Sequence, residues 1–229
     1  MQAIMEPIFH VSYLSSVIII GMIMLIKSEK NPYFRWFGIM AITLGFGDAF
    51  HLIPRIIALW TTGFESHAIS LGFGKFVTSV TMTIFYLILY KLWKIRYEVR
   101  NAHRLDIGMW SLATLRVALC FFPQNQWFVY NPPVSWGIYR NIPFAVMGII
   151  MIILYYRKGK ERKDKEALKI SAAIILSFGF YIPVVLWAQV NMLIGMLMIP
   201  KTLAYLWIVF IGYAQFRKEV KPDAQKIAS

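Results

Sequence analysis

Seven long apolar segments, separated by short polar connectors, constrain this chain more than any other feature of its sequence. We place them at residues 8–26, 36–59, 68–90, 105–122, 136–156, 167–189 and 192–216. Each is close to the ~20 residues that an α-helix needs to cross the hydrocarbon core of a bilayer. The composition agrees, because 59% of the 229 residues are hydrophobic and 15% are charged, whereas a soluble domain has about 25% charged residues. The sequence therefore predicts an all-α integral membrane bundle of seven transmembrane helices, forming a single domain over residues 1–229.

The charges of the connectors predict how the helices cross the membrane. Three, five, seven and four Lys or Arg residues follow the first, third, fifth and seventh segments, counting Lys169 at the start of the sixth segment with the fifth connector. These are 19 of the 24 in the chain. The other three connectors, residues 60–67, residues 123–135 and a short turn near Asn191, hold none. Because Lys and Arg stay on the cytoplasmic side, we expect a multi-pass protein of the cell membrane with its N-terminus outside and its C-terminus in the cytoplasm. The polar residues 217–229 are expected to form a short solvated end.

The formal net charge of +13 would also suit a nucleic-acid-binding protein. The basic connectors are short, however, and none interleaves its cations with aromatic side chains that could stack on bases. We therefore expect these connectors to contact anionic membrane lipids, and we expect no nucleic acid as a partner.

Five basic residues remain, and each lies within a predicted span: Arg55, Lys75, Arg116, Arg140 and Lys201. With the expected topology, all five fall at a similar depth in the outer half of the membrane. Only three acids, Glu6, Asp48 and Glu65, lie away from the cytoplasmic side. Each cation could reach the outer head groups by itself, but five cations against three acids favour a shared outward-facing cavity of positive potential. Such a cavity would bind an anionic or amphiphilic small molecule or a lipid head group.

Polar residues on the neighbouring helices extend this candidate site. Glu6, His10 and Tyr13 share one face at the start of the first helix, and we add His10 and Tyr13 to the ligand-binding residues. The third helix has a stripe at helical spacing formed by Lys75, Thr78, Ser79, Met82, Thr83 and Tyr86. The turn-rich loop between Pro123 and Pro133 is expected to fold over the outer mouth. Outer aromatic residues predict a membrane-interface belt of Trp60, Trp127, Phe128, Tyr130, Trp136 and Tyr139.

The segment from Gly45 to Arg55 carries the residues best suited to catalysis. Asp48, His51 and Arg55 have the spacing i, i+3, i+7, so they share one helix face. Asp48 and His51 could act as acid and base that activate water, while the arginines hold a phosphate. Asp48 could instead be the counter-charge of the five cations. The sequence leaves both roles open.

Two short motifs resemble those of a known family. The run Gly47-Asp48-Ala49-Phe50-His51-Leu52, with Pro54-Arg55 after it, resembles the Gly-Asp motif on an early helix of the bacterial lysoplasmalogenase-like membrane proteins. Tyr213-Ala214-Gln215 resembles that family's closing helix. The resemblance implies an intramembrane lipid hydrolase in which Asp48 is catalytic and the substrate is a vinyl-ether lysophospholipid. This chain lacks the acid of the family's second Ser-Asp motif, having Ser177-Phe178-Gly179 there, and it has seven predicted spans against the family's eight.

We expect neither a metal nor an organic cofactor. A zinc site needs three or four ligands, and His10, Asp48, His51 and His67 are the candidates outside the cytoplasmic side. Lys201 lies in the helix where retinal proteins form a Schiff base, but the third helix offers no carboxylate counter-ion. Between the two remaining classes, the sequence favours binding or transport over hydrolysis, because the cationic residues are better supported than a catalytic constellation.

Overall fold

The computed structural model describes residues 2–28, 31–188 and 190–227, and this part of the chain contains seven long helices, two short helices and no strand. The long helices are α1 (Gln2–Lys27), α2 (Pro32–Trp60), α3 (Ala68–Arg96), α4 (His103–Phe121), α5 (Val134–Glu161), α6 (Lys165–Trp187) and α8 (Met198–Ile227). The short ones are the 3-10 helix η1 (Pro123–Asn125) and α7 (Met192–Gly195).

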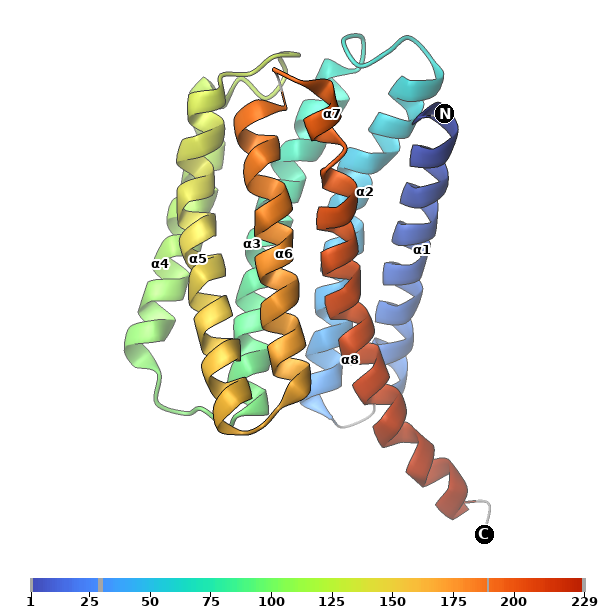
Figure 1. Ribbon diagram of the computed structural model, residues 1–229, viewed down its shortest axis with the longest axis vertical. Coiled ribbons are helices and arrows are strands. Elements are labelled where there is room, and N and C mark those ends of the chain that lie inside the picture. Colours follow the sequence, from blue (N-terminus) through green and yellow to red (C-terminus); the bar gives the residue numbers. More distant parts are fainter. Residues whose placement is uncertain (1, 29–30, 189, 228–229) are drawn as a thin grey trace.

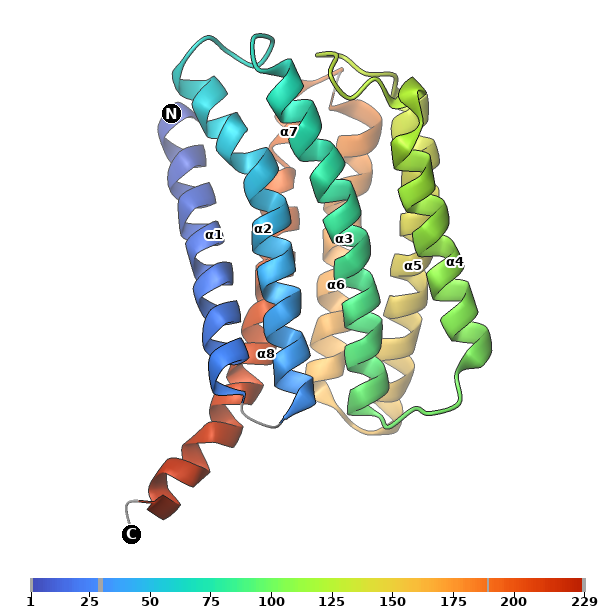
Figure 2. The same cartoon turned by 180° about the vertical axis from the view of Figure 1, so that it is seen from behind.

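Six of the long helices are long and apolar enough to cross a membrane. The exception is α4, which has 19 residues and carries Arg104, Asp106 and Arg116. It nevertheless packs lengthwise against α3 and α5 as the seventh member of the bundle (Figure 2). The predicted all-α class is therefore confirmed, and six of the seven expected spans are long and apolar enough for the predicted multi-pass pattern, with α4 the exception.

The long helices run alternately in opposite directions and form a closed ring (Figures 1 and 2). Helices that follow one another in sequence pack side by side from α1 to α6, α6 packs against α8, and α8 packs against α1. The N-terminus and the connectors after α2, α4 and α6 lie at one end of the ring, which we call the N-terminal end (top of Figure 1). The basic connectors after α1, α3 and α5 lie at the other end, together with the end of α8, and we call this the basic end.

The last predicted segment, residues 192–216, is divided in the structure. α7 ends at Gly195 and α8 begins at Met198, so Lys201 stands in the first turn of a helix. Pro200 explains the break, because its ring would clash with the carbonyl of Met196 in a continuous helix but fits the first turn of a new one. The predicted end of the sixth segment, Gln189, lies outside the described residues, and α6 ends at Trp187.

The end of the chain is also more regular than expected. α8 continues to Ile227 and projects beyond the other helices at the basic end (Figure 1). Lys218 and Glu219 are good helix formers, and Asn31 donates a hydrogen bond to the Glu219 carboxylate over 2.7 Å. The described part of residues 217–229 therefore continues the helix, and its residues 217–220 are exposed, in agreement with a solvated end.

A close approach between α2 and α3 fixes the depth of His51. A Cβ atom on Gly74 would meet the carbonyl oxygen of Phe50 and would lie 2.6 Å from the Cα atom of His51. Only a glycine allows α3 to pack this directly on the backbone of α2. The first turns of α3, which carry Lys75, are thereby held against the turn of α2 that carries His51.

Arg96 joins four segments at the basic end. Its Nε and Nη2 atoms donate to the two carboxylate oxygens of Asp164 over 2.6 and 2.8 Å. Its Nη1 atom donates to the hydroxyl of Tyr33 over 3.0 Å and to the side-chain oxygen of Gln215 over 2.6 Å. Gln215, one of the residues in the closing-helix motif, thus has a structural contact that links α8 to α3.

Asp164 has a second role as the N-cap of α6, where it accepts hydrogen bonds from the backbone N–H groups of Glu166 and Ala167. Burial by itself would raise the pKa of Asp164, but the hydrogen bonds from Arg96 and Ala167 and the charge of Arg96 hold this pKa below its ordinary value. A lowered pKa in the folded state means that the charged carboxylate stabilises the fold. This stabilisation is present above a pH of about 3.9 and is lost as the pH falls through the lower folded value.

We expect Asp164→Asn to lower the free energy of unfolding at pH 7 by about 1–3 kcal/mol, because the Arg96 ion pair is lost while an asparagine can still cap α6. Asp164→Ala should cost more, since the cap is lost too. Thermal unfolding of purified protein, followed by tryptophan fluorescence, measures both effects. The difference between wild type and Asp164→Asn should shrink below pH 4. A loss of stability that is equal at pH 7 and below pH 4 would contradict this account. The matched control is Glu161→Gln, in an exposed ion pair, which should change the stability little.

Candidate functional site

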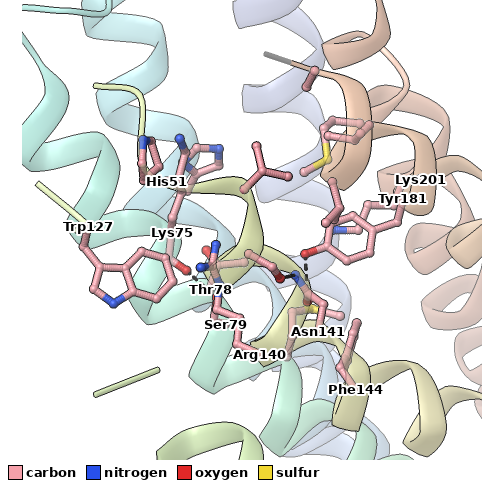
Figure 3. A pocket seen from close by; sticks show the side chains of 18 of the residues that line it. His51, Lys75, Thr78, Ser79, Trp127, Arg140, Asn141, Phe144, Tyr181 and Lys201 are labelled. Atoms are coloured by element: carbon pink, nitrogen blue, oxygen red, sulfur yellow. Dashed lines mark hydrogen bonds between the residues drawn. The ribbon is translucent and has the colours of Figure 1, made fainter. Parts of the chain in front are cut away.

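A cavity of about 300 Å³ lies inside the ring toward the N-terminal end, and we call it the cationic cavity. Its walls come from six of the long helices, from the short helix α7 and from the loop between α4 and α5. The five basic residues singled out from the sequence all line it: Arg55, Lys75, Arg116, Arg140 and Lys201. Figure 3 shows Lys75 on one side of this space, Lys201 on the opposite side, and Arg140 between them.

The helix directions explain why five distant residues reach one depth. Arg55 and Arg116 stand late in α2 and α4, which run toward the N-terminal end. Lys75, Arg140 and Lys201 stand early in α3, α5 and α8, which run away from it. The alternating direction of the helices therefore brings all five side chains to the same layer of the bundle.

Arg116 is the most buried of these cations, with 2% of its surface exposed. Its guanidinium carbon lies 3.5 Å from the ring centroid of Phe144. Its Nε and Nη1 atoms are buried and have no hydrogen-bond partner in the part of the chain that the structure describes. A buried charge without a counter-charge or hydrogen bonds is strongly unfavourable, so the surroundings of Arg116 are suited to a bound anion.

Arg140 is held by neutral groups. Its Nη1 atom donates to the side-chain oxygen of Asn125 over 2.9 Å, and its guanidinium carbon lies 4.3 Å from the ring centroid of Trp127. Asn125 is itself buried, and its amide nitrogen donates to the carbonyl oxygens of Leu119 and Phe122 over 2.7 and 2.8 Å. These contacts orient the guanidinium toward the cavity without neutralising its charge.

Lys201 is also positioned by an aromatic ring. It is 7% exposed, and its Nζ atom lies 4.3 Å from the ring centroid of Tyr181. The Tyr181 hydroxyl donates to the side-chain oxygen of Asn141 over 3.1 Å, as the dashed line in Figure 3 marks. Lys75 lines the opposite wall and remains accessible from the cavity.

Arg55 differs from the other four, because it forms an ion pair. Its Nε atom lies 2.5 Å from a carboxylate oxygen of Glu6, and its guanidinium carbon lies 5.0 Å from the ring centroid of Phe64. Among the described residues, no carboxylate lies within 4 Å of the charged nitrogens of Lys75, Arg116, Arg140 or Lys201. The cationic cavity therefore has a strong excess of positive charge.

A smaller cavity of about 50 Å³ adjoins the cationic cavity on the side of α1. Glu6, His10 and Asp48 line only this smaller space, whereas His51 lines both. Tyr13 lines neither: it is buried behind Asp48 and donates its hydroxyl hydrogen to the Asp48 carboxylate over 2.6 Å. The acid and imidazole groups of the candidate site thus lie beside the smaller cavity, and Arg55 and Lys201 line both cavities.

Several residues of the site escape prediction from the sequence. Trp127 does not join the expected aromatic belt, because its ring lies against Arg140 and its indole N–H donates to the carbonyl of Cys120 over 2.8 Å. The exposed residues Trp60, Phe128, Tyr130 and Tyr139 are consistent with such a belt. A Cβ atom on Gly72 would collide with the carbonyl of Trp127. The glycine at this position of α3 is therefore the residue in the sequence that allows the loop between α4 and α5 to pack directly on α3. No comparable feature of the sequence indicates the contacts made by four further residues of the site: Asn125, Asn141, Phe144 and Tyr181.

The candidate site does not present a ready metal centre. Among the described residues, no group of three or more His, Cys, Asp or Glu side chains is placed to hold a metal ion. The candidates from the sequence, which are His10, Asp48, His51 and His67, form no such group either. The residues are suited instead to recognising negative charge with guanidinium and ammonium groups, with two acids, Glu6 and Asp48, and two imidazoles beside them.

Because Arg116 is buried without a counter-charge, we expect Arg116→Met to leave the anion-free protein as stable as wild type, or more stable by about 1–3 kcal/mol. Thermal unfolding in a buffer of low ionic strength, without phosphate or carboxylates, measures this. Arg96→Met is the matched control, since Arg96 is paired with Asp164 and its loss should destabilise the protein strongly. A loss of stability in Arg116→Met as large as in Arg96→Met would contradict the absence of a counter-charge.

Comparison with known proteins finds no match for this chain among protein-family models, curated proteins or solved structures. The resemblance to lysoplasmalogenase-like proteins therefore stays a prediction. The function of the chain has to be argued from the site itself.

Proposed function

We propose that this protein binds an anionic small molecule or a lipid head group in the cationic cavity, and that transport of this ligand is an extension of the same function. One observation carries the proposal. Four cations, Lys75, Arg116, Arg140 and Lys201, reach one cavity without a carboxylate within ion-pair distance among the described residues. The fold holds Arg116, Arg140 and Lys201 there with aromatic rings and an amide group, none of which can neutralise their charge.

The chemistry of the cations supports an anion with several oxygen atoms. Arginine presents a planar fork of N–H donors that matches carboxylate and phosphate oxygens. A cavity with charge of one sign and walls of low dielectric constant also raises the local concentration of counter-ions. Trp127, Phe144 and Tyr181 form such walls beside Arg140, Arg116 and Lys201.

We further propose that the N-terminal end faces the outside of the cell membrane and the basic end faces the cytoplasm. The support is the retention of Lys and Arg on the cytoplasmic side, together with the gathering of all the basic connectors at one end of the ring (Figure 1). In this orientation the ligand reaches the cationic cavity from the outer side of the membrane.

We expect anions to raise the thermal unfolding temperature of the purified protein in a neutral detergent at constant ionic strength. Inorganic phosphate, short carboxylates and glycerol phosphate are the probes, because they share the expected oxygen geometry. Arg116→Gln and Arg140→Gln should each weaken binding at least tenfold, which corresponds to about 1.4 kcal/mol, since each removes a charge-assisted contact. Lys165→Gln, at the basic end, should bind as wild type does. No stabilisation by any anion, or equal stabilisation of the two arginine variants, would contradict the proposal.

The second candidate function is hydrolysis of a lipid within the membrane, with Asp48 and His51 as acid and base. Its specific support is that both residues line the small cavity beside the cationic cavity, and that His51 stands where the two meet. Asp48 has a structural explanation too, because it accepts a hydrogen bond from Tyr13 over 2.6 Å and lines the small cavity together with Lys201. We therefore rank hydrolysis below binding.

A turnover experiment separates the two functions. Purified protein is incubated with lysophospholipids, including a vinyl-ether form, and the products are followed by mass spectrometry. We expect no product above the level of Asp48→Asn, because the Asp48 carboxylate is held by the hydrogen bond from Tyr13. Turnover by the wild type that both Asp48→Asn and His51→Gln abolish would replace our proposal with the hydrolase.

A further inference from the structure

A narrow groove between α5 and α6 opens beside the cationic cavity, and we call it the α5–α6 groove. Its volume is about 150 Å³, half that of the cationic cavity. Its walls are apolar and come from both helices: Ile138, Ile142 and Ala145 of α5 and Phe178, Ile182, Val185 and Leu186 of α6. Ile142 and Ile182 are 55% and 50% exposed, so the groove lies on the face that α5 and α6 turn away from the bundle.

The packing of α5 against α6 explains where the groove begins. A Cβ atom on Gly148 would collide with the ring of Phe178, so the two helices are in tight contact at this level. Toward the N-terminal end the contact opens, and Phe178 forms the floor of the groove. Pro143 in α5 and Pro183 in α6 each remove one backbone hydrogen-bond donor there, which weakens both helices where they separate.

The groove and the cationic cavity meet at shared residues. Asn141, Tyr181 and Val185 line both spaces. Asn141 and Tyr181 are the polar residues of the groove lining, and they are hydrogen-bonded to each other over 3.1 Å. The same Tyr181 ring lies 4.3 Å from the ammonium of Lys201. One residue pair therefore separates an apolar groove from a cluster of unpaired cations.

We propose that the α5–α6 groove holds the alkyl chain of a single-chain anionic amphiphile whose head group occupies the cationic cavity. The inference rests on the proposed function and narrows its ligand class. A hydrocarbon chain stabilises the complex by covering the apolar walls, and the anionic head neutralises Lys201 and Arg116 across the Asn141–Tyr181 pair. The small volume, bounded by two helices, suits one chain, and a chain longer than the groove extends into the surrounding lipid.

The first test maps the chain on the wild-type protein in phosphatidylcholine nanodiscs. The probe is decyl phosphate with a photoreactive diazirine on its chain, and labelled peptides are identified by mass spectrometry. We expect labels concentrated in residues 138–145 and 178–186, reduced by excess methyl phosphate, which competes for the head-group position alone. Labels spread evenly over the lipid-facing helices and insensitive to methyl phosphate would overturn the inference.

The second test compares the affinity of decyl phosphate with that of methyl phosphate. The wild type should bind decyl phosphate at least about tenfold more tightly, because part of its chain is buried in the groove. Ala145→Trp fills the groove and should remove this difference while leaving methyl phosphate binding unchanged. Val146→Trp is the matched control on the neighbouring lipid-facing position, 39% exposed and outside the groove, and it should keep the difference.

The outcomes separate this inference from the proposed function. If methyl phosphate binds and the decyl chain adds nothing, the groove does not hold a chain, and anion binding stands alone. If neither phosphate binds, anion binding itself fails and this inference fails with it. The inference is supported in full if Ala145→Trp no longer binds decyl phosphate more tightly than methyl phosphate, while Val146→Trp still does.

Discussion

The low dielectric interior of a helical bundle makes an unpaired charge strongly unfavourable, and this constraint governs the N-terminal end of the protein. Arg116 is 2% exposed, and two of its guanidinium nitrogens lack hydrogen-bond partners within the described chain. Arg140 and Lys201 are oriented by Asn125, Trp127 and Tyr181, which hold a cation without cancelling it. A structure that stabilises the position of its cations and leaves their charge in place is organised for an external anion.

At the basic end, by contrast, the charge of the arginine is neutralised within the protein. There Arg96 donates two hydrogen bonds to the Asp164 carboxylate. Its Nη1 atom donates to the Tyr33 hydroxyl and to the side-chain oxygen of Gln215. This hydrogen-bonded network connects α2, α3 and α8 with the start of α6. The basic end thus uses Arg96 to stabilise the fold, while the N-terminal end keeps Arg116 and Arg140 available. The α5–α6 groove joins the N-terminal end to the lipid-facing surface.

Much of this arrangement follows from the sequence alone. Hydropathy and the alternating connectors predict the helices and their directions, and the directions bring Arg55, Lys75, Arg116, Arg140 and Lys201 to one layer. Contacts between distant residues are beyond such reasoning. The break between α7 and α8 depends on how Pro200 is accommodated, and the site of Trp127 depends on a loop that rests on Gly72. The α5–α6 groove likewise arises from the fit of Phe178 on Gly148, which no local pattern reveals.

The most direct test of the central claim is to locate an anion by its anomalous scattering. Crystals of the full-length protein soaked in tungstate, a tetrahedral oxyanion with a strong anomalous signal, should show a peak inside the cationic cavity. The account predicts that this peak lies within hydrogen-bond distance of the Arg116 guanidinium and close to Arg140 and Lys201. An empty cavity at full soaking, with tungstate bound only at the basic end, would contradict it.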